Sequence, residues 1–265
     1  MTSWFVAYLL LGGFAGFCAG LLGVGGGGVM VPVLVVMFTA QQFPVEHVMH
    51  LALGTSLATI IFTSVSSFRA HHQHGAVLWP VVKVIAPGIV VGTFLGAQIV
   101  SHVSTKALVI FFVAFMSYVS LQMILNVKPK PSRSLPGPGG MFAVGAGIGG
   151  ISSLVAIGGG SLSVPFMTWC NVKMHQAIGT SSAIGFPIAV AGTVGYMVGG
   201  YGADHLPSGS VGFIYLPALA VLVASSVLLA PVGARLAHRL PVVALKRIFA
   251  GVLMLLSGKM LHSLF

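Results

Sequence analysis

Charged side chains are scarce in this sequence, and acidic ones are almost absent. Only 5% of the 265 residues are charged, with 12 Lys and Arg against 2 Asp and Glu, whereas soluble domains carry about 25%. This inventory cannot cover a water-exposed surface, which excludes a cytosolic enzyme, a secreted domain and a disordered chain. The basic residues stand singly between apolar stretches, so the net charge of +10 does not predict binding to nucleic acid.

Cysteine is almost absent as well. Cys18 and Cys170 lie within or at the end of apolar stretches, so we expect buried free thiols, and their number excludes a disulfide framework. The histidine cluster at His71, His72 and His74 lacks cysteine or carboxylate partners. We therefore predict no metal site and no cofactor.

Apolar segments fill most of the chain. Hydrophobic residues make up 57% of it, and 36 glycines come in addition. Most windows hold about 20 to 25 residues, the length of one helical bilayer crossing. We predict an all-α, polytopic helical protein, integral to the inner (plasma) membrane of a bacterium. The apolar windows are 5–38, 48–68, 77–100, 107–126, 141–169, 176–199, 211–232 and 242–262.

The two halves of the chain repeat one another. Residues 1–127 and 141–265 are the predicted transmembrane repeats, and the Pro- and Gly-rich segment 128–140 links them. Several matches in the same order are not expected by chance, and secondary transporters are commonly built from such repeats. The matching pairs are 24–32 with 157–165, 50–57 with 175–182, and 75–80 with 212–217.

Basic residues indicate that the repeats are inverted. Lys and Arg accumulate in cytoplasmic loops. With Lys83 left out because it lies within a window, an odd number of crossings in each half places only Lys106 and Lys259 outside, whereas an even number divides the basic residues almost equally. We therefore predict that the 128–140 linker is cytoplasmic. We also predict that each glycine-broken window enters and leaves the membrane on the same side, either as a re-entrant hairpin or as two short crossings. The residues placed inside are Arg69, Lys128, Lys130, Arg133, Lys173, Arg235, Arg239, Lys246 and Arg247.

Runs of glycine interrupt the first and fifth windows. The interruptions are Gly25, Gly26, Gly27 and Gly28 in one repeat, and Gly158, Gly159, Gly160 and Ser161 in the other. Freed N–H groups inside a membrane need partners, and a glycine turn that starts a helix presents such groups to an anion. We expect the two runs to meet near the midplane and to line one substrate cavity. The alternative is close packing of helices through small residues.

Hydroxyl and ionisable side chains near the runs are further candidates. Thr55 and Ser56, and equally Thr180 and Ser181, begin the second helix of each repeat and could donate to an oxyanion; the alternative is bonding to helix carbonyls. His50 and His175 stand one turn earlier, either as ligands or proton carriers or as interfacial side chains. Lys83 lies within a window and either contacts substrate or snorkels to the interface.

The glycine run closed by Val-Pro, repeated with a following Gly-Thr-Ser triplet, resembles the sulfite exporter TauE/SafE family of membrane permeases. Further likenesses are segments 209–220, 231–239 and 246–256. The resemblance implies transport of sulfite or small organosulfonates. The buried segments also lack carboxylates, which favours a small anion over a cation. An anion channel and, much less favoured, an intramembrane enzyme built on Ser161 are the alternatives. The expected partners are a small anion and the lipid bilayer, and the sequence assigns no oligomeric state.

Overall fold

The structure is a computed structural model that describes residues 2–22, 25–125, 132–237 and 242–264. These residues form ten helices and one short hairpin, and seven of the described helices are long and apolar enough to cross a membrane. The all-α prediction is confirmed. The elements are α1 (Thr2–Leu22), α2 (Gly27–Ala40), α3 (Val48–Gln73), α4 (Trp79–Val100), α5 (Thr105–Ile124), α6 (Pro138–Val155), α7 (Gly160–Trp169), α8 (Met174–Gly199), β1 (Ser210–Val211), β2 (Ile214–Tyr215), α9 (Leu216–Ala237) and α10 (Val242–Leu264).

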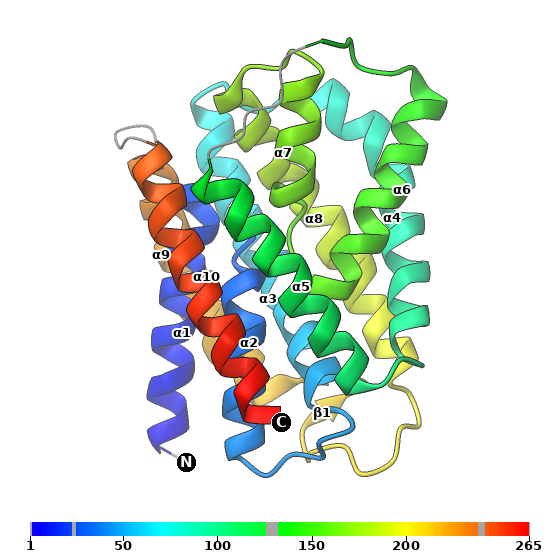
Figure 1. Ribbon diagram of the computed structural model, residues 1–265, viewed down its shortest axis with the longest axis vertical. Coiled ribbons are helices and arrows are strands. Elements are labelled where there is room, and N and C mark those ends of the chain that lie inside the picture. Colours follow the sequence, from blue (N-terminus) through cyan, green and yellow to red (C-terminus); the bar gives the residue numbers. More distant parts are fainter. Residues whose placement is uncertain (1, 23–24, 126–131, 238–241, 265) are drawn as a thin grey trace.

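The two repeats are inverted relative to each other. In Figure 1 both chain ends lie at the lower end of the bundle, whereas the segment that leads into α6 lies at the upper end. The α1–α2 hairpin enters and leaves at the lower end, and the α6–α7 hairpin does so at the upper end. Three further helices complete each repeat, so an odd number of crossings separates the repeats, as the charge pattern predicts. Each hairpin has a long arm and a short arm, since α2 and α7 have 14 and 10 residues.

The predicted windows agree closely with the helices, with two differences. The window that starts at 211 begins with the antiparallel pair β1–β2, and α9 starts only at Leu216. Gly209 and Gly212 have φ of 87° and 53° there, and glycine adopts such turns readily. The second difference is that α6 begins at Pro138, inside the predicted linker, because proline suits the first turn of a helix.

Small residues interlock the two repeats. Helix α1 of the first repeat packs against α9 of the second, and α6 of the second packs against α4 of the first. A Cβ at Gly16 would overlap the backbone of Ser226, and a Cβ at Gly88 would overlap that of Phe142. These helices therefore approach to backbone contact, as glycines spaced by four allow in membranes.

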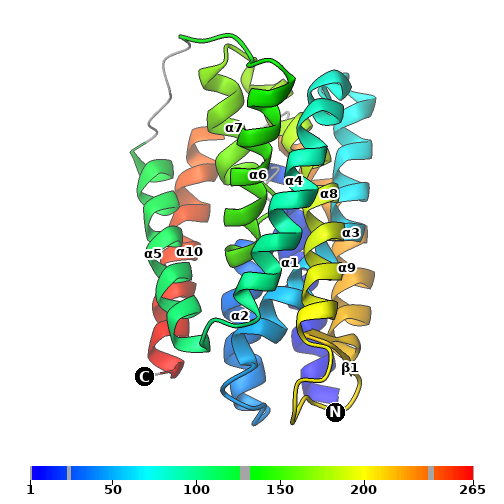
Figure 2. The ribbon, with the colours of Figure 1, turned by 90° about the vertical axis from the view of Figure 1, so that its right-hand side faces the viewer.

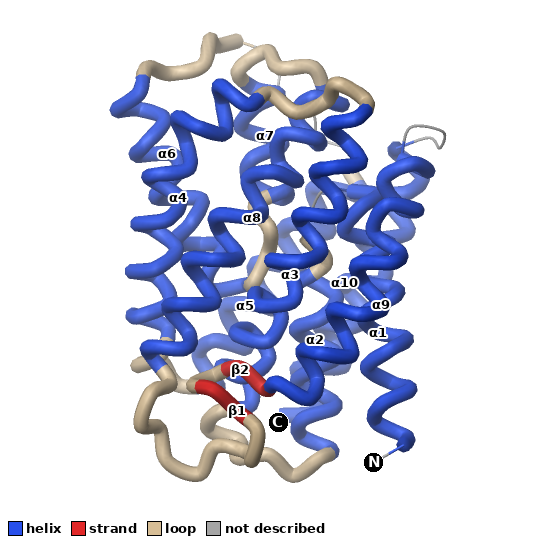
Figure 3. Tube along the Cα trace, turned by 180° about the vertical axis from the view of Figure 1, so that it is seen from behind, coloured by secondary structure: helices blue, strands red, loops and turns tan. Residues whose placement is uncertain are grey.

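The centre of the bundle is the contact between α3 and α8, the two longest helices. They occupy equivalent places in the two repeats, so this contact lies at the repeat interface. Helices α5 and α10 pack on each other along one edge of the bundle (Figure 2). The β1–β2 hairpin covers the end at which the chain termini lie (Figure 3). The glycine turns of both hairpins are thus enclosed by helices from both repeats.

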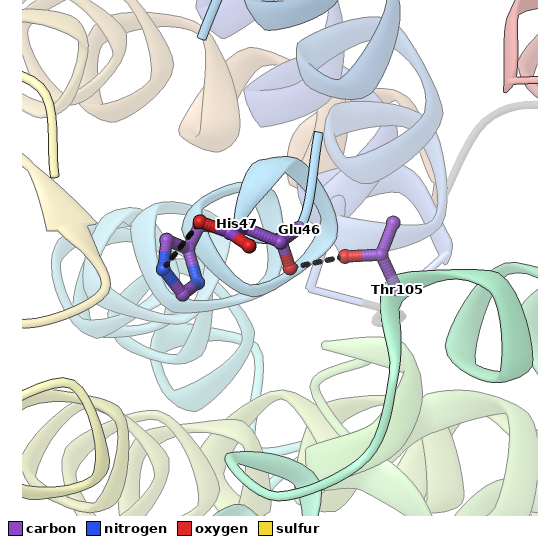
Figure 4. Close-up of polar contacts among 3 residues, drawn as sticks. All are labelled: Glu46, His47 and Thr105. Atoms are coloured by element: carbon purple, nitrogen blue, oxygen red, sulfur yellow. Dashed lines mark hydrogen bonds and ion pairs between the residues drawn. The ribbon is translucent and has the colours of Figure 1, made fainter. Parts of the chain in front are cut away.

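The end of the bundle with the termini holds a short polar contact. Glu46 and His47 lie in the loop between α2 and α3, and their side chains are 3.7 Å apart (Nε2 to Oε1). The Thr105 hydroxyl donates to the Glu46 carbonyl at 2.5 Å (Figure 4), which ties this loop to the start of α5. Described basic residues at the opposite end include Arg69 and Arg235 near helix ends, Arg133 and Lys173 in loops, and Lys246 and Arg247 in the first turns of α10.

We predict that Ser132→Cys is accessible from the cytoplasm and Ser208→Cys from outside, because basic residues gather at the linker end. Both positions are exposed and lie at opposite ends. The measurement is labelling of intact cells by an impermeant maleimide, in a background without Cys18 and Cys170. Even in a protein that keeps them, the two native thiols should label slowly, because both are buried and burial raises the pKa of the Cys170 thiol. Labelling of Ser132→Cys in intact cells would reverse the predicted orientation.

Candidate functional site

Each glycine-broken segment turns at a glycine in the left-handed conformation. Gly26 precedes α2 with φ 77° and ψ −12°, and Gly159 precedes α7 with φ 81° and ψ −16°. Residues with a Cβ rarely adopt these angles, so both turns require glycine. No side chain caps either helix start, and the first N–H groups of a helix lack intrahelical partners. The sequence repeat is therefore also a repeat in backbone geometry.

The tips of the two hairpins meet inside the bundle. A Cβ added to Gly25 would lie 2.7 Å from the Gly158 Cα and 2.8 Å from its nitrogen, and one added to Gly27 would overlap the carbonyl of Ala156. The structure thus brings the two predicted runs together, backbone against backbone. The expectation that they approach each other is confirmed.

A small cavity lies at this contact. Gly25 and Gly158 line it together with the serines Ser64, Ser67 and Ser182, which come from α3 and α8. The Ser67 hydroxyl donates to that of Ser182 at 3.4 Å across the repeat interface. The cavity volume is about 10 Å³, which is the space that one water molecule needs. The lining is neutral, and its serine hydroxyls are bonded within the protein: Ser64 donates to the Ile61 carbonyl, and Ser182 donates to the Ile178 carbonyl.

The Gly-Thr pairs hold the loops before α4 and α9. The Thr55 hydroxyl accepts the N–H of Tyr215 at 3.0 Å, and the Thr180 hydroxyl accepts the N–H of Leu78 at 2.9 Å. The glycine before each threonine leaves room for that loop, since a Cβ at Gly179 would lie 2.6 Å from the Ala76 carbonyl oxygen. Each hydroxyl keeps its own hydrogen to donate, so a substrate role for Thr55 and Thr180 stays a prediction.

We expect Thr55→Val and Thr180→Val each to lower the free energy of unfolding by about 1–3 kcal/mol, because a loop N–H loses its acceptor. The measurement is thermal or denaturant unfolding in detergent. Thr93→Val is the matched control, since the buried Thr93 hydroxyl has no partner among the described residues, and its removal should be neutral or stabilising. Equal stability of all three proteins would contradict the loop-holding role. Anion affinity, measured on the same proteins, tests the substrate role separately.

Serine residues next to these motifs retain unused bonding capacity. Ser181 accepts a hydrogen bond from Ser163 of α7 at 3.0 Å, whereas the buried hydroxyls of Ser56 and Ser161 have no partner among the described residues. Ser161 stands in the first turn of α7 and is 8% exposed. A buried hydroxyl without a hydrogen bond costs about 1–3 kcal/mol. Ser56 and Ser161 are therefore suited to accept an external partner.

The ionisable candidates lie away from the glycine contact. His50 is buried, its Nε2 donates to the Val100 carbonyl at 3.1 Å, and its ring packs on Phe213 with 4.9 Å between centroids. His175 is exposed at the start of α8, and Lys83 is exposed on α4. The three residues are not brought together by the fold, and none lines the cavity. A role in coupling for either histidine stays a prediction.

The three clustered histidines make separate contacts. His71 Nε2 lies 3.2 Å from the Gly20 carbonyl oxygen, and His72 Nδ1 accepts from the Trp79 indole at 3.2 Å. The His74 Nδ1 lies 2.8 Å from the Ala70 carbonyl oxygen. In the described part of the chain, no three potential metal ligands converge.

Ser64 and Ser67 line the cavity although the sequence analysis does not single them out, whereas Ser182 stands directly beside the second Gly-Thr-Ser triplet. A signal for Ser67 exists, because Thr55, Thr59, Thr63 and Ser67 follow one another at intervals of four along α3. This spacing places hydroxyls along one side of a helix, and all four side chains are buried. Such a stripe in a membrane helix indicates a polar contact within the protein.

Comparison with known proteins identifies the family. The profile described as sulfite exporter TauE/SafE matches residues 8–260. A probable membrane transporter protein of Haemophilus influenzae is 36% identical over 252 residues, covering 94% of this chain and 95% of the relative. The probable membrane transporter proteins YunE and YdhB of Bacillus subtilis are 30% and 28% identical, over 74% and 87% of this chain and 80% and 89% of their own. No solved structure matches significantly.

These matches cover the described helices almost completely and confirm the resemblance. The bacterial relatives and the seven membrane-length helices also confirm an integral protein of the inner membrane. The chain therefore belongs to the sulfite exporter TauE/SafE family and is a membrane transporter, not an enzyme.

Proposed function

We propose that the protein exports a small sulfur oxyanion, such as sulfite or an organosulfonate, by alternating access at the repeat interface. The substrate-binding groups are the backbone donors of the glycine runs, Gly25–Gly28 and Gly158–Ser161, with the neighbouring serine hydroxyls. The family description supports the substrate class.

The meeting of the two glycine turns carries this proposal. The starts of α2 and α7 face into the bundle without side-chain caps, and Gly25 lies against Gly158. Helix starts attract negative charge through their free N–H groups and their dipoles. An anion that leaves water needs several donors in return. Backbone N–H and hydroxyl groups supply them without a fixed positive charge, which favours reversible binding.

The size of the cavity supports a moving carrier. Sulfite has four non-hydrogen atoms, whereas the cavity of about 10 Å³ has room for one water molecule. The glycine contact must therefore loosen before substrate binds. Because the contact joins hairpins that enter from opposite ends of the bundle, loosening it from either end would expose the same groups to a different side.

The decisive experiment is transport in proteoliposomes with sulfite, thiosulfate, sulfoacetate, taurine and sulfate. We expect saturable transport of sulfite or an organosulfonate. Flux that rises linearly with concentration would indicate a channel, and absence of flux for all five compounds would overturn the proposal.

Serine variants test the location of the site. Ser67→Ala and Ser182→Ala should each weaken binding of the transported anion by about tenfold, because a hydrogen bond to a charged group is worth about 1.5–3 kcal/mol. Ser120→Ala is the matched control, since Ser120 is also a buried serine but lies on α5, outside the cavity. Unchanged affinity in both cavity variants would move the site elsewhere.

A further inference from the structure

An open groove of about 620 Å³ lies between α3 and α9, separate from the glycine contact. Its wall is apolar along Phe62, Val65 and Val227. Arg69 of α3 and Arg235 of α9 line its other end, and both side chains are exposed. The groove thus changes from apolar to basic along its length.

The dimensions of the groove match one membrane leaflet. From Phe62 to Gln73 the lining follows α3 over twelve residues, and the eleven steps between them span about 16 Å at 1.5 Å per residue. The hydrocarbon core of a bilayer is about 30 Å thick, so the groove covers about half of it. Because α3 ends at Gln73 and α9 at Ala237, the arginines lie at the level of the lipid headgroups.

The protein supplies no carboxylate to these arginines. The sequence contains only two acidic residues, Glu46 and Asp204. Both lie in loops at the end where the chain termini and the β1–β2 hairpin lie (Figures 1 and 3), and the Glu46 carboxylate contacts His47. No carboxylate of the chain neutralises Arg69 or Arg235, so both charges are available to an anion from outside the chain.

We propose that this groove binds an anionic phospholipid, with its phosphate between Arg69 and Arg235 and an acyl chain along Phe62, Val65 and Val227. A free small anion would use only the basic end and would leave the apolar wall without a role. A lipid occupies both parts, because its charge and its hydrocarbon are arranged in the same order. This inference does not depend on the transported substrate.

The test is lipid retention by the full-length protein after extraction from vesicles of equal phosphatidylglycerol and phosphatidylcholine, measured by native mass spectrometry. We expect preferential retention of phosphatidylglycerol. Replacement of both arginines (R69Q/R235Q) should lower that retention about thirtyfold, since each basic residue near an anionic surface is worth about 1 kcal/mol. The matched control is Lys173→Gln, which removes an exposed basic residue at the same end but outside the groove; it should leave retention unchanged.

A second variant separates lipid from a free anion. Val227→Trp fills the apolar wall without changing charge and should also reduce retention of phosphatidylglycerol. Equal retention by wild-type and R69Q/R235Q proteins would overturn the proposal. Displacement of the lipid by inorganic phosphate, with no effect of Val227→Trp, would overturn it in favour of a small-anion site.

Discussion

Gly149→Leu should prevent the protein from assembling as a stable bundle. A Cβ at this position of α6 would lie 2.5 Å from the carbonyl oxygen of Ile89 and 2.8 Å from the Thr93 nitrogen. Both are backbone atoms of α4, so no side-chain rotation relieves the overlap. We expect the free energy of unfolding to fall by at least about 3 kcal/mol, the upper end of ordinary overpacking costs. The measurements are the yield of monodisperse protein and its unfolding temperature in detergent.

The control for this variant is two positions away. Gly147 lies on the same helix, and a Cβ added there would meet no atom within 4 Å. Gly147→Leu should therefore fold with near wild-type stability. If both leucine variants gave equal yields, backbone contact between α4 and α6 would not be what holds the repeats together.

The second large effect is expected at the site itself. Gly25→Ala should reduce sulfite transport by at least about tenfold, equivalent to about 1.4 kcal/mol. Two causes combine: alanine is strained at the observed φ of 81°, and its Cβ would lie 2.7 Å from the Gly158 Cα. Initial rates in proteoliposomes, normalised to reconstituted protein, measure the effect.

The Gly75→Ala variant is the control that measures the effect of backbone strain without the contact to Gly158. Gly75 has a φ of 64°, and a Cβ added there would meet nothing within 4 Å. A left-handed alanine costs about 1–2 kcal/mol, so Gly75→Ala should lose some stability and keep its transport rate. Equal transport by the two variants would mean that the glycine contact is not part of the substrate path.

Much of the fold can be predicted from the sequence, because a membrane-spanning helix must be apolar over its length and must keep its backbone groups hydrogen-bonded. Apolar length fixes the spans, and both glycine runs coincide with helix breaks because a backbone turn within the membrane needs glycine. The inverted arrangement follows from the positions of Lys and Arg. The sequence does not predict in the same way that α1 packs on α9 and α6 on α4, each helix against the other repeat. The described helices are apolar and most of them contain several small residues, so composition does not reveal which helix packs on which.

The candidate site is readable only in part. The meeting of Gly25 with Gly158 follows from the repeat. The main contact of Thr55 does not, because its partner Tyr215 is 160 positions away and is a backbone group in an unpredicted hairpin. His50 and His175 occupy equivalent sequence positions, yet one is buried and the other exposed. Local motifs specify the chemistry that a residue offers, whereas loops from the other repeat decide what it contacts.

The packing of α1 on α9 and of α6 on α4, across the two repeats, also determines when the bundle forms during synthesis. Helix α1 is made before its partner α9, which emerges roughly 190 residues later, a delay of roughly 10–40 s at 5–20 residues per second. During that time the glycine face of α1 has no native neighbour from α9. The first repeat therefore stays incompletely packed in the membrane until most of the second repeat has been inserted. Until then, the insertion machinery or lipid must cover the glycine face of α1.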